Sequence, residues 1–232
     1  MNAILKCESI SKTFAKSTAL SHVNLTLERG RIIGLLGTNG SGKTTLLKII
    51  NGLLVPDEGK IEIAGMSPGI ATKKIISYLP ERTYLADWMR VVEVIQFFKD
   101  FYEDFDSNKA YDMLERLKIN PNQHLKTFSK GTKEKVQLIL VMSRKADLYC
   151  LDEPIGGVDP ASRDYILNTI ISNYSENQTI LMSTHLIADI ENVLDEVIFI
   201  KDGSITLHSS VDDLRGKEGK SVDSLFREVF KC

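Results

Sequence analysis

The chain has 232 residues, and its 29 basic and 31 acidic side chains leave a net charge of −2. This length is enough for one large domain, or for a domain that carries a subdomain. No basic block is present, so we expect no nucleic-acid partner, although the near-neutral charge leaves binding through a local patch open.

The cysteines and the apolar runs indicate the cellular setting. Cys7, Cys150 and Cys232 are odd in number and lack metal-ligand spacing, which indicates a reduced, cytosolic protein. The chain opens on a polar, charged segment, so we expect no signal peptide. No apolar run approaches the roughly 20 residues that span a bilayer. We therefore expect any role at a membrane to be played from its surface.

Runs rich in Ile, Val and Leu predict the strands of a buried sheet. In chain order they are Ala3–Cys7, Arg31–Leu36, Lys60–Ile63, Ile75–Leu79, Leu148–Leu151, Thr179–Met182 and Glu196–Ile200. Asp202-Gly203 follows the last run and is a hairpin signal, so we expect the sheet to end in an antiparallel pair.

Between about Val91 and Arg144 the apolar pattern becomes helical, and it predicts two apolar helix faces and an amphipathic helix over Lys130–Arg144. The faces are Val91, Val94, Ile95, Phe98, Tyr102 and Phe105, then Ala110, Met113, Leu114 and Leu117. Ser221–Lys231 predicts one short docking helix. The sequence therefore predicts an α/β core at residues 1–81 and 147–232, interrupted by an all-helical subdomain at about 82–146.

A glycine-rich segment lies between the predicted strand Arg31–Leu36 and a predicted helix, Thr44–Ile50. Its pattern of Gly, four free residues and Gly-Lys-Thr is that of the phosphate-binding P-loop. Glycines let successive N–H groups turn inward around a phosphate, and the helix N-terminus adds partial positive charge. Lys43 is expected to reach the β- and γ-phosphates, and the Thr44 hydroxyl to bind Mg²⁺. The predicted nucleotide-binding residues are Gly37, Thr38, Asn39, Gly40, Ser41, Gly42, Lys43, Thr44 and Thr45.

The predicted strand Leu148–Leu151 ends in two carboxylates, Asp152 and Glu153. Charge at the end of a buried strand is costly unless it has a function. We expect Asp152 to hold Mg²⁺ beside Thr44, directly or through water, and Glu153 to be the general base for an attacking water. The alternative is a strand that simply emerges into solvent, but a P-loop upstream favours the catalytic interpretation.

These motifs and five further features resemble the ordered motif set of ATP-binding-cassette (ABC) ATPases, over essentially the whole chain. The resemblance implies that Phe14 stacks on adenine and that Glu81 lies where the core joins the helical subdomain. It places Ser129 and Gly131 in the signature segment, Phe128–Thr132. Two of these residues also have simpler interpretations, because Phe14 fits an ordinary hydrophobic position and Ser129 is a good helix N-cap whatever the function.

The resemblance extends to the end of the chain. Gly157-Val158-Asp159 matches the loop after the catalytic carboxylate, which makes Asp159 a nucleotide-site residue, and His185 matches the switch histidine that contacts the γ-phosphate. A polar strand end is the simpler interpretation of His185. The implied fold is a P-loop NTPase (RecA-like) core with an antiparallel β subdomain and an inserted all-helical subdomain. The implied ligands are ATP and Mg²⁺.

Two motifs depart from the usual ABC pattern. Lys130 and Thr132 replace a glycine and the glutamine of the signature, and Glu81 replaces the glutamine of the core-to-helical loop. Glu81 adds negative charge beside a triphosphate, and we expect it to be a metal ligand together with Thr44 and Asp152. Ser-Lys-Gly and Leu-Pro-Glu both resemble bacterial ATPase subunits of ABC-2-type exporters.

The resemblance implies a mechanism that needs two cassettes packed head to tail. ATP held by Lys43 of one chain is closed by Ser129 and Gly131 of a second, identical or similar, cassette. Hydrolysis, with Glu153 as base and His185 at the γ-phosphate, then reopens the pair and drives a polytopic membrane permease from the cytoplasmic face. Two alternatives are a soluble ABC ATPase in a non-transport complex and an ATP-binding switch that does not hydrolyse. A turnover assay distinguishes a hydrolysing ATPase from the switch. Recovery of the chain with a polytopic membrane protein favours transport, whereas recovery in a soluble complex favours the non-transport role.

Trp88, the only tryptophan, has two interpretations of nearly equal weight. In the family, the segment Arg82–Met89 lines the groove that receives a cytoplasmic helix of the permease, which makes Trp88 an anchor for the membrane subunit. In the other interpretation, Trp88 packs beneath the helical subdomain with Phe98 and Tyr102.

Overall fold

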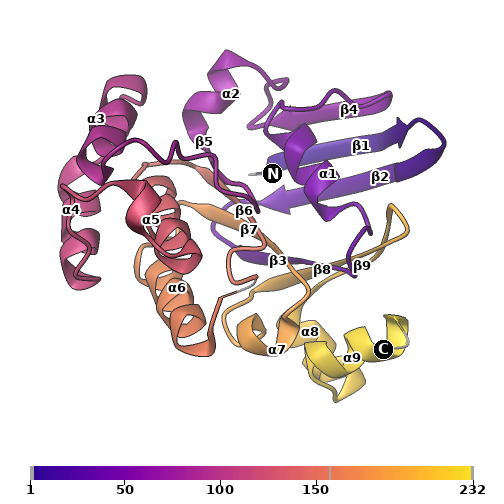
Figure 1. Cartoon of the computed structure of the whole chain (residues 1–232). Helices are drawn as coiled ribbons and strands as arrows, with labels where there is room; N and C mark the ends of the chain where they lie inside the picture. Colours follow the sequence, from indigo (N-terminus) through magenta and orange to yellow (C-terminus); the bar gives the residue numbers. More distant parts are fainter. Residues whose placement is uncertain (1–2, 157, 231–232) are drawn as a thin grey trace.

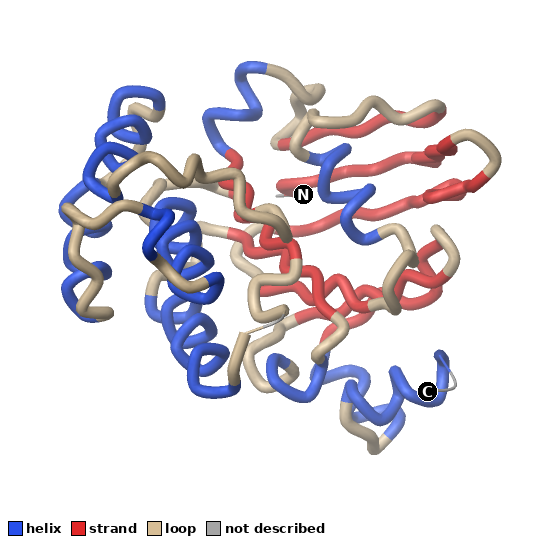
Figure 2. Tube along the Cα trace, viewed as in Figure 1, coloured by secondary structure: helices blue, strands red, loops and turns tan. Residues whose placement is uncertain are grey.

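The computed structural model, which describes residues 3–156 and 158–230, contains two β-sheets flanked by helices (Figures 1 and 2). The six-stranded sheet has the order β5-β6-β7-β3-β8-β9, in which only β9 is antiparallel to its neighbour. Its strands are β3 (Ile32–Leu36), β5 (Ile76–Leu79), β6 (Leu148–Asp152), β7 (Thr179–Thr184), β8 (Glu196–Lys201) and β9 (Ser204–Ser210). The β8–β9 hairpin confirms the turn predicted at Asp202-Gly203.

Side chains on the two faces of the parallel strands enter different parts of the core. On β3, Ile33 and Leu35 join a cluster that contains helix α1 (Lys43–Ile50) and the smaller sheet. Ile32 and Leu36 face the other cluster, which the remaining helices cover. A strand buried on both faces must be apolar throughout, which is why β3 reads as a continuous apolar run. The functional consequence is that β3, β6 and β7 are held side by side, with their carboxyl ends at one edge of the sheet.

The smaller sheet is antiparallel, with the order β2-β1-β4. It consists of β1 (Ala3–Phe14), β2 (Ser17–Glu28) and β4 (Glu58–Ile63). The strand predicted at Ala3–Cys7 is correct but too short, because the rest of β1 is polar and half exposed. The predicted strands do not include β2, whose buried Leu20, Val23, Leu25 and Leu27 alternate with exposed residues only after an irregular start.

The helices between β5 and β6 form a group of their own at one side of the sheet (Figure 1). They are α3 (Val91–Phe101), α4 (Ser107–Arg116), a short 3-10 turn (Leu125–Thr127) and α5 (Lys130–Met142). The predicted apolar faces are confirmed as core by the burial of residues such as Val91, Phe98 and Met113. The faces overrun the helices, however, because Tyr102 caps α3 and Phe105 lies beyond it.

Trp88 does not pack beneath these helices. Its side chain is 72% exposed, whereas Phe98 is 5% exposed. The rings of Tyr102 and Phe105, with centroids 5.5 and 5.6 Å from that of Phe98, already fill the space around it. The prediction that Trp88 joins Phe98 and Tyr102 in the core is therefore wrong.

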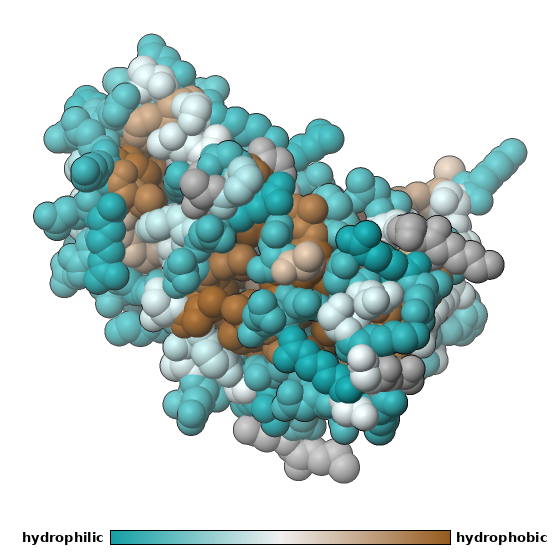
Figure 3. Space-filling model, turned by 90° about the horizontal axis from the view of Figure 1, so that it is seen from below, coloured by the Kyte–Doolittle hydropathy of each residue, from teal (hydrophilic) through white to brown (hydrophobic). Residues whose placement is uncertain are grey.

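The remaining helices are α2 (Ile70–Ile75), α6 (Pro160–Ser172), α7 (Ile187–Ile190), α8 (Val211–Glu218) and α9 (Val222–Phe230). The predicted C-terminal helix is confirmed as α9, and it docks on the sheet through Phe226, whose ring centroid lies 5.5 Å from that of Phe199 in β8. Within the described ranges, none of the helices has the length and apolar composition needed to cross a bilayer. Seen from below, the surface is mostly hydrophilic, with apolar side chains gathered in the centre and on one lobe (Figure 3).

Candidate active site

The predicted P-loop connects β3 to α1 and wraps around the side chain of Lys43. The ammonium of Lys43 is buried and donates to the carbonyls of Gly37 at 2.8 Å and Thr38 at 3.2 Å. Gly42, at the N-cap of α1, has φ +109°, and a Cβ there would lie 2.5 Å from the carbonyl oxygen of Ala19. Only glycine fits this backbone, and without a capping side chain the first N–H groups of α1 stay available to a phosphate.

A cavity of about 240 Å³ lies over this loop. It is lined by Ala19, Asn39, Gly40, Ser41, Gly42, Lys43, Thr44, Thr45, Glu81 and Glu153. Seven of these are predicted P-loop residues, and the other two predicted ones, Gly37 and Thr38, hold Lys43 from beneath through their carbonyls. The hydroxyl of Ser41 is buried without a hydrogen-bond partner among the described residues, as expected for a group that faces a ligand.

Asp152 ends β6 at the base of the P-loop, and it is 1% exposed. Its Oδ1 accepts from the hydroxyls of Ser183 at 2.6 Å and Thr44 at 3.2 Å, whereas its Oδ2 is buried without a partner among the described residues. Burial raises the pKa of Asp152. The nearby charges of Glu81 and Glu153 raise it further, whereas the hydrogen bonds from the two hydroxyls lower it. An unpaired buried carboxylate oxygen beside the Thr44 hydroxyl is the oxygen donor set that Mg²⁺ prefers.

These residues fit a Mg²⁺ ion that is completed by substrate oxygens. Among the described residues, no group of three or more His, Cys, Asp or Glu side chains is arranged to hold a metal by itself. Mg²⁺ in nucleotide sites is typically held by one or two protein ligands together with phosphates and water. Thr44 and Asp152 fit the protein side of such a site, and Glu81 lines the same cavity as Thr44.

Glu153 follows Asp152 and bends away from the strand. Its φ of +50° lies in the left-handed region, which is uncommon for a residue with a side chain. One carboxylate oxygen, Oε1, lies 3.4 Å from the ammonium of Lys43, and the other, Oε2, lies 3.0 Å from Nδ1 of His185. The fold therefore brings together the three residues predicted to be catalytic.

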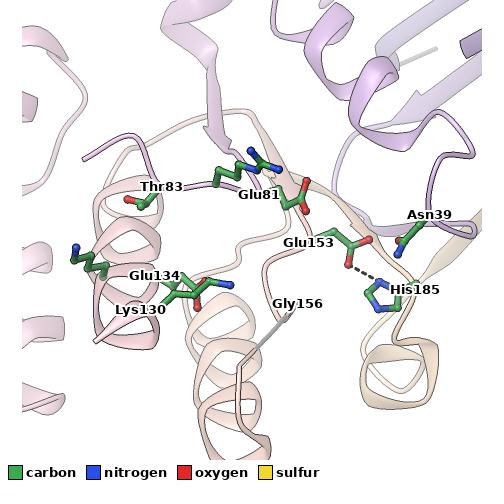
Figure 4. Close-up of a pocket in the computed structure, with 10 residues that line it drawn as sticks. Asn39, Glu81, Thr83, Lys130, Glu134, Glu153, Gly156 and His185 are labelled. Carbon is green, nitrogen blue, oxygen red and sulfur yellow. Dashed lines mark hydrogen bonds and ion pairs between the residues drawn. The ribbon is translucent and has the colours of Figure 1, made fainter. Parts of the chain in front are cut away.

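A larger cavity, of about 820 Å³, lies between the core and α5 (Figure 4). Asn39, Glu81, Glu153 and His185 line it on the core side, and Lys130, Lys133 and Glu134 of α5 line it on the other. Lys130 also forms an ion pair with Glu134 at 3.6 Å. Both departures from the usual ABC pattern, Glu81 and Lys130, thus lie on the wall of one cavity and carry opposite charges.

Ser129 and Gly131 stand apart from the P-loop of the same chain. Ser129 is the N-cap of α5, where its hydroxyl accepts from the N–H of Thr132 at 3.2 Å, so the simpler interpretation of Ser129 is confirmed. Neither Ser129 nor Gly131 is among the described residues that line the two cavities. The P-loop cavity of this chain is therefore formed without Ser129 and Gly131, although Lys130 between them lies on the wall of the larger cavity.

Two other predicted residues lie outside these cavities. Phe14 ends β1 and is 46% exposed, with the ammonium of Lys12 at 5.6 Å from its ring centroid. Asp159 immediately precedes α6, and its carbonyl accepts from the N–H of Arg163 at 3.0 Å. Gly157, which belongs to the same predicted loop, lies outside the described residues. Both roles, adenine stacking by Phe14 and a nucleotide contact by Asp159, stay predictions.

Ser183 is the site residue that the motif analysis does not single out. It is fully buried near the end of β7, and its hydroxyl bonds to Asp152 and to the backbone of Glu153. The available signal is its place in Ser183-Thr184-His185, a polar run at the end of an apolar strand.

A P-loop between a parallel strand and a helix, with acidic residues at the end of a neighbouring strand, defines a nucleotide-binding protein of the P-loop class. The sequence model of the ABC transporter family matches residues 20–156. The chain therefore belongs to the ABC transporter family, as an ATP-binding subunit.

The most similar proteins agree with this assignment. The ABC transporter ATP-binding protein YtrB of Bacillus subtilis is 30% identical over 91% of this chain and 74% of its own. The SkfA peptide export ATP-binding protein SkfE of the same organism is 31% identical over 87% of each chain. A solved structure of an ATP binding subunit of an ABC transporter superimposes with a TM-score of 0.87 at 27% identity, over 98% of this chain and 99% of that one.

Proposed function

We propose that the chain hydrolyses ATP and so drives an exporter, as one of two cassettes bound to a separate membrane permease at the cytoplasmic face. The observation that carries the hydrolytic part is the position of Glu153, whose carboxylate lies between Lys43 and His185 at the edge of the P-loop cavity. A base for the attacking water and a cation for the phosphates are groups that phosphoryl transfer to water uses, and His185 is in contact with the base.

In the proposed reaction, a water oxygen attacks the γ-phosphorus, and the bond from that phosphorus to the β–γ bridging oxygen breaks. Glu153 takes the proton of the water, and His185, bonded to the second oxygen of Glu153, keeps the carboxylate oriented. Lys43 and the N–H groups of the P-loop bind the negative phosphate oxygens. Thr44 and Asp152, with Glu81 as a further ligand, would hold Mg²⁺, and the ion would supply positive charge to the phosphates.

The second part of the proposal is that each site is completed by another cassette. Ser129 and Gly131 belong to the N-terminus of α5, a position suited to an anion, yet they do not line the cavity of their own chain. A second cassette, identical or similar, that presents this segment to the γ-phosphate closes the site. ATP then holds the pair together, and hydrolysis releases it.

The exporter assignment rests on likeness. SkfE is named as a peptide export protein and matches over 87% of each chain. Glu81 and the Ser129-Lys130-Gly131 signature resemble the ABC-2-type exporters. We further propose that residues 1–81 and 147–232 form the core, that about 82–146 form the helical subdomain, and that Trp88, exposed on this subdomain, contacts the permease.

Replacement of Glu153 tests the hydrolytic part. Glu153→Gln should lower the ATPase rate by about two to four powers of ten, because an amide does not accept the proton of the attacking water. ATP binding should persist, because Lys43 and Thr44 are unchanged, and size-exclusion chromatography with ATP should show a dimer. Glu28→Gln is the matched control, since β2 places Glu28 beside the amino ends of the parallel strands, away from the site. An ATPase rate near that of the parent in Glu153→Gln protein would show that Glu153 is not the base.

A further inference from the structure

Ser183 connects the two carboxylate residues of the site through a single hydroxyl. It lies next to the end of β7, and in the parallel pairing of β6 and β7 it is the direct partner of Asp152. Its side chain is fully buried, so its hydrogen bonds are made only within the protein interior.

The hydroxyl acts as donor and acceptor at the same time. It donates its one proton to Oδ1 of Asp152 at 2.6 Å, and its oxygen accepts from the backbone N–H of Glu153 at 3.1 Å. The carbonyl of Ser183 accepts from the same N–H, also at 3.1 Å. The result is a directed chain of bonds from Glu153 through Ser183 to Asp152, in which each bond polarises the next.

For Asp152, the bond from Ser183 decides which oxygen stays available. Ser183 and Thr44 both donate to Oδ1, and Oδ2 is left without a partner among the described residues. Because both hydroxyls bind the same oxygen, the carboxylate is fixed in rotation, and Oδ2 is the oxygen left for a metal. A partner behind a metal ligand that fixes its orientation is a common feature of metal sites.

For Glu153, the same residue holds an unusual backbone conformation. The left-handed φ of +50° turns the side chain of Glu153 away from the strand and toward His185. That conformation persists only where surrounding contacts fix it. The two acceptors on Ser183 fix the N–H of Glu153, and the N–H of Gly156 donates to the carbonyl of Glu153 at 3.0 Å.

We propose that Ser183 is a positioning residue that sets the metal-binding oxygen of Asp152 and the direction of Glu153 together. The proposal deepens the proposed function and rests on it. It predicts that loss of one buried hydroxyl weakens metal binding and the chemical step at once, while nucleotide binding without metal is unchanged.

Ser183→Ala is the test variant, and Ser77→Ala is the matched control. Ser77 is also a buried serine on a parallel strand, with its hydroxyl donated to the carbonyl of Val141, away from the carboxylates. ADP binding is measured by calorimetry in EDTA and in Mg²⁺. Ser183→Ala should keep the affinity for ADP in EDTA and should need about 10- to 100-fold more Mg²⁺ for the same gain in affinity. Its kcat for ATP should fall by a similar factor with little change in KM at saturating Mg²⁺. Ser77→Ala should keep all these values within about threefold, and Ser183→Thr or Ser183→Cys, which retain a donor, should restore part of the loss.

The outcomes separate the proposal from the proposed function. Mg²⁺ dependence within about threefold of the parent in Ser183→Ala, or an equal loss in Ser77→Ala, overturns the role of Ser183. A parent protein without ATPase activity defeats the proposed function instead, and the calorimetric comparison still decides the role of Ser183. If Ser183→Ala does not fold, Ser183→Cys and Ser183→Thr carry the same comparison.

Discussion

Arg144 joins the helices that follow β5 to the sheet, and its removal should destabilise the whole chain. The side chain is 4% exposed, and Nε donates to both oxygens of Asp104, at 3.1 and 3.2 Å. Nη1 donates to the carbonyl of Ile76 at the start of β5, and Nη2 donates to that of Lys74 in α2 at 2.9 Å. The guanidinium also lies 3.9 Å from the ring centroid of Tyr102.

The expected magnitude follows from these contacts. Breaking a buried ion pair by removing one partner typically costs about 3–5 kcal/mol, because the remaining polar groups stay buried without their donor. Arg144→Ala leaves the carbonyls of Lys73, Lys74 and Ile76 and the Asp104 carboxylate, which is 24% exposed, without their donor. In a chain of this size, 1 kcal/mol corresponds to roughly 2–4 °C in Tm, so we expect a fall of about 6–20 °C.

Urea unfolding and thermal melting measure this loss, and Lys145→Ala is the control. Lys145 is adjacent in sequence, carries the same charge and is exposed, so its removal should change the free energy of unfolding by less than about 0.5 kcal/mol. Arg144→Lys should be intermediate, since an ammonium retains charge without the planar fork. If Arg144→Ala and Lys145→Ala unfold at the same urea concentration, Arg144 does not link the helices to the sheet.

The other predictions concern the partner surfaces and Asp152. Ser129→Arg should leave ATP binding by the monomer unchanged and prevent ATP-dependent dimerisation in chromatography; loss of binding by the monomer would place Ser129 in its own pocket. Trp88→Ala should keep Tm and basal ATPase activity but lose co-purification with the permease, and normal recovery of the permease would refute the contact. In EDTA at neutral pH, Asp152→Asn should raise Tm, because burial raises the pKa of Asp152 and its ionisation therefore destabilises the native state as the pH rises above the ordinary 3.8. That gain should shrink as the pH is lowered toward 3.8, and a Tm below that of the parent would contradict it.

The sequence predicts best those elements whose local pattern has one explanation. Strand β3 is apolar throughout and precedes a P-loop, so its place in a buried parallel sheet and the helix after it are both predictable. Strand β2 is not, because its alternation becomes regular only after the bulged pairing near Lys12 and Leu20. Helix α6 is also absent from the predicted elements. Its buried side includes Ile166 and Ile170, but its short apolar run resembles that of a strand.

At the candidate site, motif spacing predicts the residue types but not their contacts. That Lys43, Glu153 and His185 converge follows from the order β6-β7-β3, which places their three strands side by side. Ser183 escapes prediction because the run Ser183-Thr184-His185 points only to its histidine, and the role of the serine depends on register with Asp152. For Trp88 the sequence leaves burial undecided, because an aromatic residue between apolar segments has the same local pattern whether it is buried or exposed.

The residues that carry the site are also those that break the ordinary rules of folding. Asp152 places a carboxylate oxygen in the interior without a partner among the residues that the structure describes, and Glu153 adopts a left-handed backbone conformation. Each such feature costs on the order of 1–3 kcal/mol. A ligand present at about 100 times its Kd stabilises the native state by about 2.7 kcal/mol, which is comparable to one of these costs. Metal binding at Oδ2 of Asp152 would therefore offset about one of these costs. Apolar residues at these positions would stabilise the strand end but would provide neither a metal ligand nor a base.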